Sequence, residues 1–142
     1  MFVRILLTCA FGESLDGVEL DWYANGTVEK KELTFVLRNA VADCVERITH
    51  GRNLLFPSMI NYYILPSERE TKKNCLGLRT LVSEMVDKRR AELKKDPEGV
   101  KARGDLLSIL CTDELFCNDT EMIKDECLTF FFAGSQTSAN NT

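Results

Sequence analysis

The sequence has little with which to span a membrane, hold a metal ion or attract nucleic acid. It contains no run of about 18 apolar residues, the length that a membrane-spanning helix needs. His50 is the single histidine, and no two of the six cysteines have the C-x-x-C spacing, so a zinc site of the usual kinds is not expected. The formal net charge of -4 argues against nucleic acid as the main partner.

Residues that interrupt regular structure are also scarce, because the 142 residues include only eight glycines and three prolines. This scarcity favours long helices. Hydrophobic residues make up 44% and charged residues 28%, which is typical of a globular domain and excludes a disordered or fibrous chain. Most of the cysteines lie among apolar neighbours at helical spacing, where we expect reduced thiols that pack as small hydrophobic groups. They are Cys9, Cys44, Cys75, Cys111, Cys117 and Cys127.

The fold class predicted from the apolar pattern is all-α. An apolar stripe that includes Leu33 advances in steps of three and four residues and predicts a helix over about 28–50. The glycine-containing stretch 12–27 is predicted to be a loop. The stretch 54–66 is strongly apolar but contains two prolines, so we expect an apolar linker rather than one regular helix.

Three further helices are indicated by the residues at their ends. Ser67 and Glu70 form a capping-box pattern, and the helix that follows is stopped by Asp-Pro-Glu-Gly at 96–99. Asp105 is the expected cap of a short helix, and Asn-Asp-Thr at 118–120 starts the last helix. The four predicted helices therefore cover about 28–50, 67–95, 105–111 and 120–142.

Charge is unevenly distributed in the second half of the chain. The segment 87–103 is rich in lysine and arginine, whereas 105–126 is acidic. Two interpretations stay open: these are the solvated faces of surface helices, or they form a docking patch for a charged partner.

The most informative pattern is Ala-Gly-Ser-Gln-Thr-Ser at 133–138, in the apolar part of the last predicted helix. Ala133 and Gly134 precede Thr137 by four and three residues and share its side of the helix. A glycine within a helix costs about 1 kcal/mol relative to alanine, and a flat cofactor lying against the helix would account for it. Close packing of a second helix, with Thr137 bonded to its own backbone, is the alternative.

Together with three other segments in the same order, this pattern resembles the cytochrome P-450 family of haem-thiolate monooxygenases. The four segments are Cys9-Ala-Phe-Gly12, Val86-Asp-Lys-Arg-Arg90, Asp105-Leu-Leu-Ser-Ile-Leu110 and Ala133-Gly-Ser-Gln-Thr-Ser138. They resemble, in turn, the end of the family's helix E, the close of its helix G, its helix H and its oxygen-activation signature. The resemblance covers essentially the whole chain but only the middle of the family's sequence. It therefore implies that 1–142 is a partial segment of one P-450-like domain, truncated at both ends.

The resemblance implies a role for each residue of the signature. Thr137 would hold a hydrogen-bonded water and relay a proton to dioxygen at the haem iron, with Gln136 beside it. Ala133 and Gly134, with Thr137, would line the haem-side groove. The substrate pocket would be lined by Thr129, Phe132 and Ala133.

The chain departs from the family pattern in two respects. Gln136 stands where the family commonly has an acid, and an amide can orient water but cannot carry a proton at ordinary pH. None of the six cysteines lies in the family's haem-binding motif, and its E-x-x-R pair is also absent. The resemblance therefore implies the oxygen side of an active site without its iron-ligating cysteine, and this segment alone is expected to be inactive.

For the whole protein, the resemblance implies a monooxygenase that inserts one oxygen atom from O2 into a lipophilic substrate. Its cofactor would be haem, its electrons would come from NADPH through a reductase, and its location would be the cytosolic face of the endoplasmic reticulum membrane. The linker 54–66 would contact the membrane or roof the substrate entrance, and packing against the rest of the domain remains the alternative. A second hypothesis stays open: the chain is a stand-alone helical interaction module without catalysis.

Overall fold

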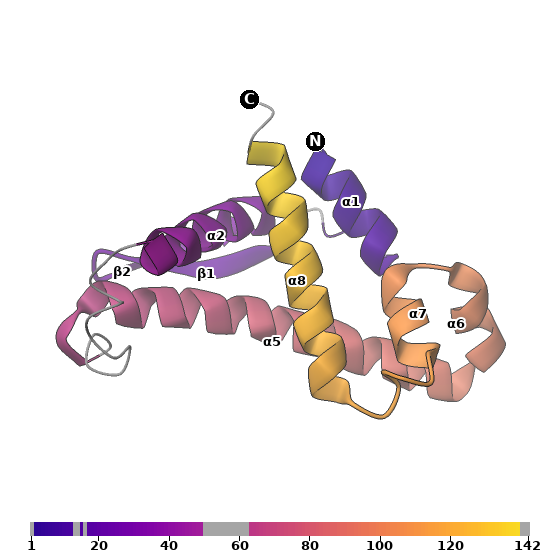
Figure 1. The fold of residues 1–142 in the computed structure, drawn as a ribbon. Coiled ribbons are helices and arrows are strands. Elements are labelled where there is room, and N and C mark those ends of the chain that lie inside the picture. The colour runs from indigo at the N-terminus through magenta and orange to yellow at the C-terminus, as the bar shows by residue number, and fades with distance from the viewer. Residues whose placement is uncertain (1, 13–14, 16, 50–62, 140–142) are drawn as a thin grey trace. The chain divides into compact units, whose positions relative to one another are not determined.

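The computed structural model describes residues 2–12, 15, 17–49 and 63–139 (Figure 1). Within these ranges, the side chains of 2–4, 6–7, 48–49 and 135–139 lie outside the description. The prediction of a mainly helical chain is confirmed, although a two-stranded sheet is present as well. The elements are α1 (Phe2–Phe11), β1 (Glu19–Ala24), β2 (Thr27–Glu32), α2 (Leu33–Thr49), α5 (Pro66–Lys95), α6 (Pro97–Arg103), α7 (Leu106–Thr112) and α8 (Thr120–Ala139).

The chain forms two compact units. One consists of Met1–Asp16 and Arg79–Thr142, and the other of Gly17–Leu78. We call them the α8 unit and the hairpin unit. The long helix α5 contributes its first residues to the hairpin unit and the remainder to the α8 unit.

The hairpin unit begins with the sheet, which corrects two predictions. Residues 19–32, expected to be partly loop and partly helix, form an antiparallel hairpin in which Trp22 lies opposite Glu29. The turn between the strands places Asn25 at φ 52° and Gly26 at φ 76°, the left-handed conformation that an Asn-Gly hairpin turn requires. Helix α2 therefore begins only at Leu33, where the apolar stripe begins, and its first buried residues are Leu33, Val36 and Leu37. The predicted end of this helix at Gly51 lies outside the described residues.

Helix α5 begins at Pro66 and ends at Lys95, which confirms the predicted span of 67–95 to within one residue. The predicted capping box at its start is wrong, because the Glu70 carboxylate binds the hairpin turn instead. It accepts the backbone N–H groups of Asn25, at 3.2 Å, and Gly26, at 2.6 Å. One turn further along, Asn74 is buried and exchanges two hydrogen bonds of 2.8 and 3.0 Å with the backbone of Tyr23. Two polar side chains of α5 thus fix the hairpin.

The α8 unit confirms the predicted helix starts. Asp105 accepts the backbone N–H of Ser108 at 2.8 Å and caps α7, and Asp119 accepts that of Met122 at 3.0 Å before α8. The predicted stop after α5 is confirmed, but Asp96 also caps the short helix α6. Helix α8 is described to Ala139, and 140–142 lie outside the description. The buried apolar residues of this unit are Ala10, Phe11, Val82, Met85, Val86, Val100, Leu107, Leu110, Cys111, Ile123, Cys127 and Phe131.

Candidate functional site

Helix α8 carries the residues predicted to have a function, and one face of it is anchored in the core of its unit. Ile123, Cys127 and Phe131 follow one another at four-residue steps and are at most 1% exposed. The ring of Phe131 packs against that of Phe11 from α1, with centroids 4.7 Å apart and planes tilted by 54°. Helices α1 and α8 accordingly lie side by side in Figure 1. This face fixes how α8 is rotated about its own axis.

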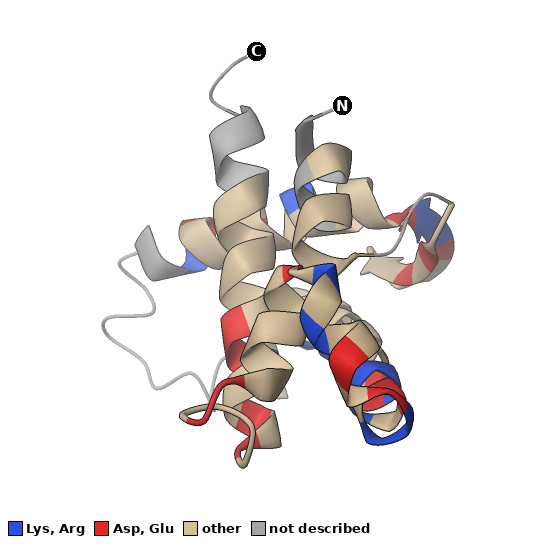
Figure 2. Cartoon of the chain, turned by 90° about the vertical axis from the view of Figure 1, so that its right-hand side faces the viewer, with Lys and Arg blue, Asp and Glu red and all other residues tan. Residues whose placement is uncertain are grey.

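Ion pairs hold the first turns of α8. Arg79 of α5 donates to Glu121 at 2.7 Å and to Asp125 at 3.0 Å, and Figure 2 shows acidic residues on the first turns of the helix and uncharged residues beyond them. Arg90, also of α5, donates to the Thr120 hydroxyl and to the Cys117 carbonyl. Part of the acidic segment is therefore paired within the chain, and Arg90 of the basic segment is bonded to uncharged groups of the same chain.

The predicted substrate-pocket residues Thr129 and Ala133 are both exposed. Each lies two residues from a buried neighbour, Phe131, and two residues correspond to about 200° of rotation around an α-helix. They therefore form a face of α8 turned away from the core, which we call the open face. The Thr129 hydroxyl donates to the carbonyl of Asp125 at 2.9 Å, so it is tied to its own helix. Phe132, the third predicted pocket residue, is half-buried.

The two small residues predicted to share one groove have different surroundings. Ala133 is exposed on the open face, whereas Gly134 is buried. Gly134 comes three residues after Phe131, so it continues the buried face. The backbones of Gln136 and Thr137 are part of α8, but their side chains lie outside the described residues. Thr137 follows Ala133 by four residues, which places it one turn further along that side of the helix.

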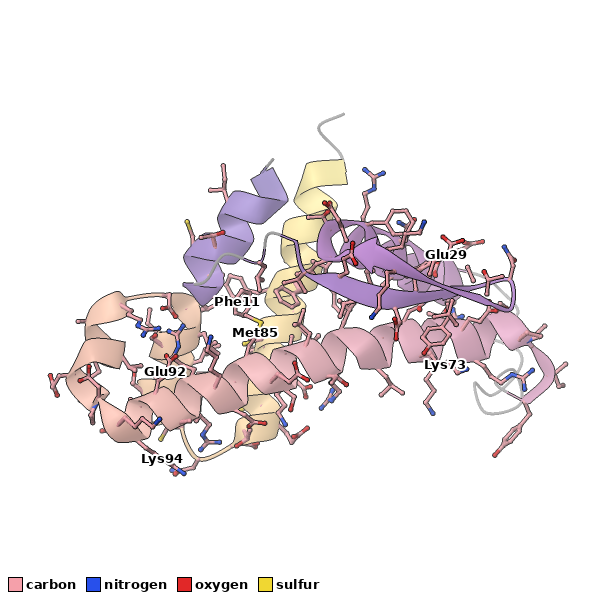
Figure 3. The ribbon with its side chains drawn as sticks, turned by 180° about the vertical axis from the view of Figure 1, so that it is seen from behind. Phe11, Glu29, Lys73, Met85, Glu92 and Lys94 are labelled. Carbon is pink, nitrogen blue, oxygen red and sulfur yellow. The ribbon has the colours of Figure 1, made fainter. Side chains whose placement is uncertain are left out.

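A buried arginine, not singled out by sequence reasoning, connects the elements around α8. Arg89 of α5 is 1% exposed, and it donates to the Asp105 carboxylate at 2.7 Å, to the Ser108 hydroxyl and to the Phe11 carbonyl at 3.0 Å. Figure 3 shows Phe11 on α1 and Met85 on α5, both buried. Because the ring of Phe11 packs on α8, Arg89 positions α1, α7 and, through α1, the anchored face of α8.

The hairpin unit also contains a pocket of about 320 Å³ that sequence reasoning did not predict. It is lined by the turn end of the hairpin, the C-terminal half of α2 and the start of α5. Arg47 spans it, donating to the Glu68 carboxylate at 2.6 Å and to the Ser67 carbonyl at 2.9 Å. Burial raises the pKa of Asp43 in the same wall. The Asn25-Gly26 turn signal could have indicated the hairpin that forms one side.

The cysteines buried in the α8 unit do not suit the iron-binding side of a haem group. On the open face, Ala133 carries only a methyl group. A haem-iron thiolate needs an ionised sulfur, but burial raises the pKa of Cys111 and raises that of Cys127 to about 12. Both thiols are buried among the side chains of the core. Among the described residues, no cluster of three or more His, Cys, Asp or Glu side chains could hold a metal ion.

No family model matches the sequence, and no solved structure matches the chain. Within the described ranges, none of the helices combines the length and the apolar character needed to cross a membrane.

Proposed function

We propose that this chain is the oxygen-side wall of a haem-dependent monooxygenase of the cytochrome P-450 type. The observation that carries the proposal is the open face of α8: Thr129 and Ala133 are exposed on a helix whose opposite face is fixed by buried packing. A wall of an active site needs this combination of a rigid support and an exposed face. Thr137 follows on the same helix.

The positions of the other motifs support the proposal. The segment 9–12 coincides with the end of α1, and 86–90 lies in the last part of α5. The segment 105–110 contains the cap and most of α7. Arg89 and Asp105, which come from two of these motifs, form the buried ion pair, so the motifs that are separate in sequence are in contact.

Each residue of this wall has a task in the proposed reaction. Haem, when bound, would supply the activation of dioxygen. Thr129, Phe132 and Ala133 would orient a lipophilic substrate, and the Thr137 hydroxyl would pass a proton from water. Gln136 would orient that water by hydrogen bonding through its amide, without transferring a proton to it. The reductase partner, NADPH as electron source and an endoplasmic reticulum location belong to the same proposal.

The proposal is tested on the gene product that carries this chain. We expect its reduced, carbon-monoxide-bound form to have the Soret band of a haem thiolate. We expect Thr137→Ala to keep that band and to lower product formed per NADPH severalfold, with more peroxide released, because proton delivery by a positioned group is lost.

Thr112→Ala is the matched control, because it removes the same kind of hydroxyl group from a different helix, α7. There the Thr112 hydroxyl donates to the Ser108 carbonyl at 2.9 Å. This variant should keep its coupling. The absence of the Soret band would refute the proposal as a whole. A normal coupling ratio in Thr137→Ala would refute the role of Thr137 alone.

A further inference from the structure

Two cysteines face each other between α2 and α5 in the hairpin unit. The Sγ atoms of Cys44 and Cys75 lie 4.0 Å apart, although the residues are 31 positions apart in the chain. Both side chains are half-buried, one on each helix. A disulfide needs the two sulfurs about 2.05 Å apart, so closing the bond requires a movement of about 2 Å.

The surroundings make the two sulfurs chemically different. Either thiol can donate the hydrogen bond that joins the two sulfurs. When Cys44 accepts it, this bond lowers the pKa of Cys44 to about 7; Arg47 also lowers it, whereas burial and Asp43 raise it. The pKa of Cys75 is raised, because it donates that hydrogen bond and is partly buried. Arg47 is held in place by Glu68 of α5 at 2.6 Å. We therefore assign the attack on an oxidant to Cys44 and the resolving step to Cys75.

The buried thiols of the α8 unit provide a contrast. Cys111 and Cys127 are both in the core, and burial raises the pKa of each. A thiol that remains protonated attacks an oxidant slowly, because the thiolate is the reactive form. Cys44 should therefore react before these two buried thiols.

We propose that Cys44 and Cys75 are a redox-responsive dithiol, which a hydroperoxide converts to a disulfide that cross-links α2 to α5. The Cys44 thiolate attacks one peroxide oxygen, the O–O bond breaks, and the leaving oxygen takes a proton to become water. The resulting sulfenic acid is attacked by Cys75, which gives up its proton as the S–S bond forms and a second water leaves. Two electrons pass from the sulfurs to hydrogen peroxide, and a dithiol reductant reverses the step. This inference is independent of the proposed monooxygenase.

Tryptic peptide mapping tests the proposal directly. Trypsin releases Cys44 in the peptide 39–47 and Cys75 in 74–79, and each peptide contains one cysteine. The 142-residue chain is treated with limiting hydrogen peroxide, alkylated and digested without reductant. We expect the linked pair 39–47 and 74–79 as the first and main disulfide product, and its loss after dithiothreitol.

Two controls make the result specific. The same treatment in concentrated urea should abolish the preference, because the pair depends on the fold. In Cys75→Ser, Cys44 should stop as a sulfenic acid that a dimedone probe captures, whereas Cys9→Ser should form the disulfide as the unaltered chain does. Preferred linkage of any other cysteines, an equal yield of the pair in urea, or no dimedone adduct on Cys44 would overturn the proposal.

Discussion

At the scale of single residues, the arrangement around α8 depends on a charge that is fully enclosed. Arg89 is 1% exposed, and its partner Asp105 is 6% exposed. Removing such charges from water is costly, and their attraction compensates only when hydrogen bonds satisfy the remaining polar atoms. Here Asp105 also accepts from the Ser108 backbone and caps α7, so one carboxylate stabilises both the ion pair and the helix start.

The first prediction concerns the pH dependence of this ion pair. Burial alone would raise the pKa of Asp105, but hydrogen bonds from Arg89 and Ser108 lower it below its ordinary value of 3.8. The unfolded chain therefore binds this proton more readily than the folded chain. The ion pair stabilises the fold above the ordinary pKa, and that contribution is lost as pH falls through the lowered pKa.

Asp105→Asn should consequently lower the free energy of unfolding by about 3 kcal/mol near neutral pH, because it removes the nearer of the two carboxylates beside the buried arginine and leaves only Glu92, at 3.4 Å. The difference from the unaltered chain should shrink as the pH falls below 3.8. Urea unfolding followed by circular dichroism at several pH values measures it. Asp21→Asn is the control: its ion pair with Lys30, at 2.9 Å, is exposed, so its effect should stay within about 1 kcal/mol. A difference for Asp105→Asn that does not vary with pH would contradict the argument.

At the scale of elements, the structure differs from the sequence prediction where local signals conflict. Residues 27–32 contain four charged helix formers and one apolar residue, Val28, which is 55% exposed. Such a segment has no buried face to mark it as a strand. The Asn25-Gly26 turn, the contacts of Glu70 and Asn74 and an ion pair across the strands decide its conformation instead.

The turn supplies the second prediction, a pair of glycine substitutions with opposite signs. A Cβ added at Gly26 or at Gly77 would meet nothing within 4 Å, so only the backbone conformation distinguishes the two positions. Gly26 has a φ of 76°, and alanine there should destabilise the hairpin unit by about 1 kcal/mol. Gly77 lies inside α5, and alanine there should stabilise it by up to about 1 kcal/mol. Thermal unfolding of both variants measures the shifts, and shifts of the same sign would contradict this account.

The candidate site was predictable in part. The helix that carries it was predicted from its start at 118–120 and from its apolar residues, and Thr129 and Phe132 were identified as residues of that helix. Which of Ala133 and Gly134 is buried could not be predicted, because both are small and both suit close packing. The different burial of the two residues depends on the rotation of α8 about its axis, which the packing of Phe131 against Phe11 fixes. Arg89 was hidden within a basic segment, where solvated side chains are the usual outcome.

At the scale of the whole molecule, the division into two compact units has a consequence for stability. Apolar periodicity predicts each helix separately. It does not indicate which helices pack together into one compact unit. The hairpin unit depends on contacts between segments distant in sequence, such as Asn74 with Tyr23 and Arg47 with Glu68. If each unit opens by itself, a covalent link within one should leave the other unchanged.

The disulfide between Cys44 and Cys75 provides that test. It closes a loop between residues 31 positions apart, and restricting the unfolded chain in this way contributes about 4 kcal/mol in the loop-entropy model. We therefore expect amide hydrogen exchange in α2 and the hairpin to slow markedly after oxidation, while exchange in α7 and α8 stays the same. Peptide-resolved exchange mass spectrometry on the oxidised and the reduced chain measures the exchange in all of these elements. The Cys75→Ser variant treated with peroxide should show no slowing in α2 or in the hairpin. Equal slowing in α2 and α8 would mean that the two units open as one cooperative body, because the link then raises the cost of a single shared transition.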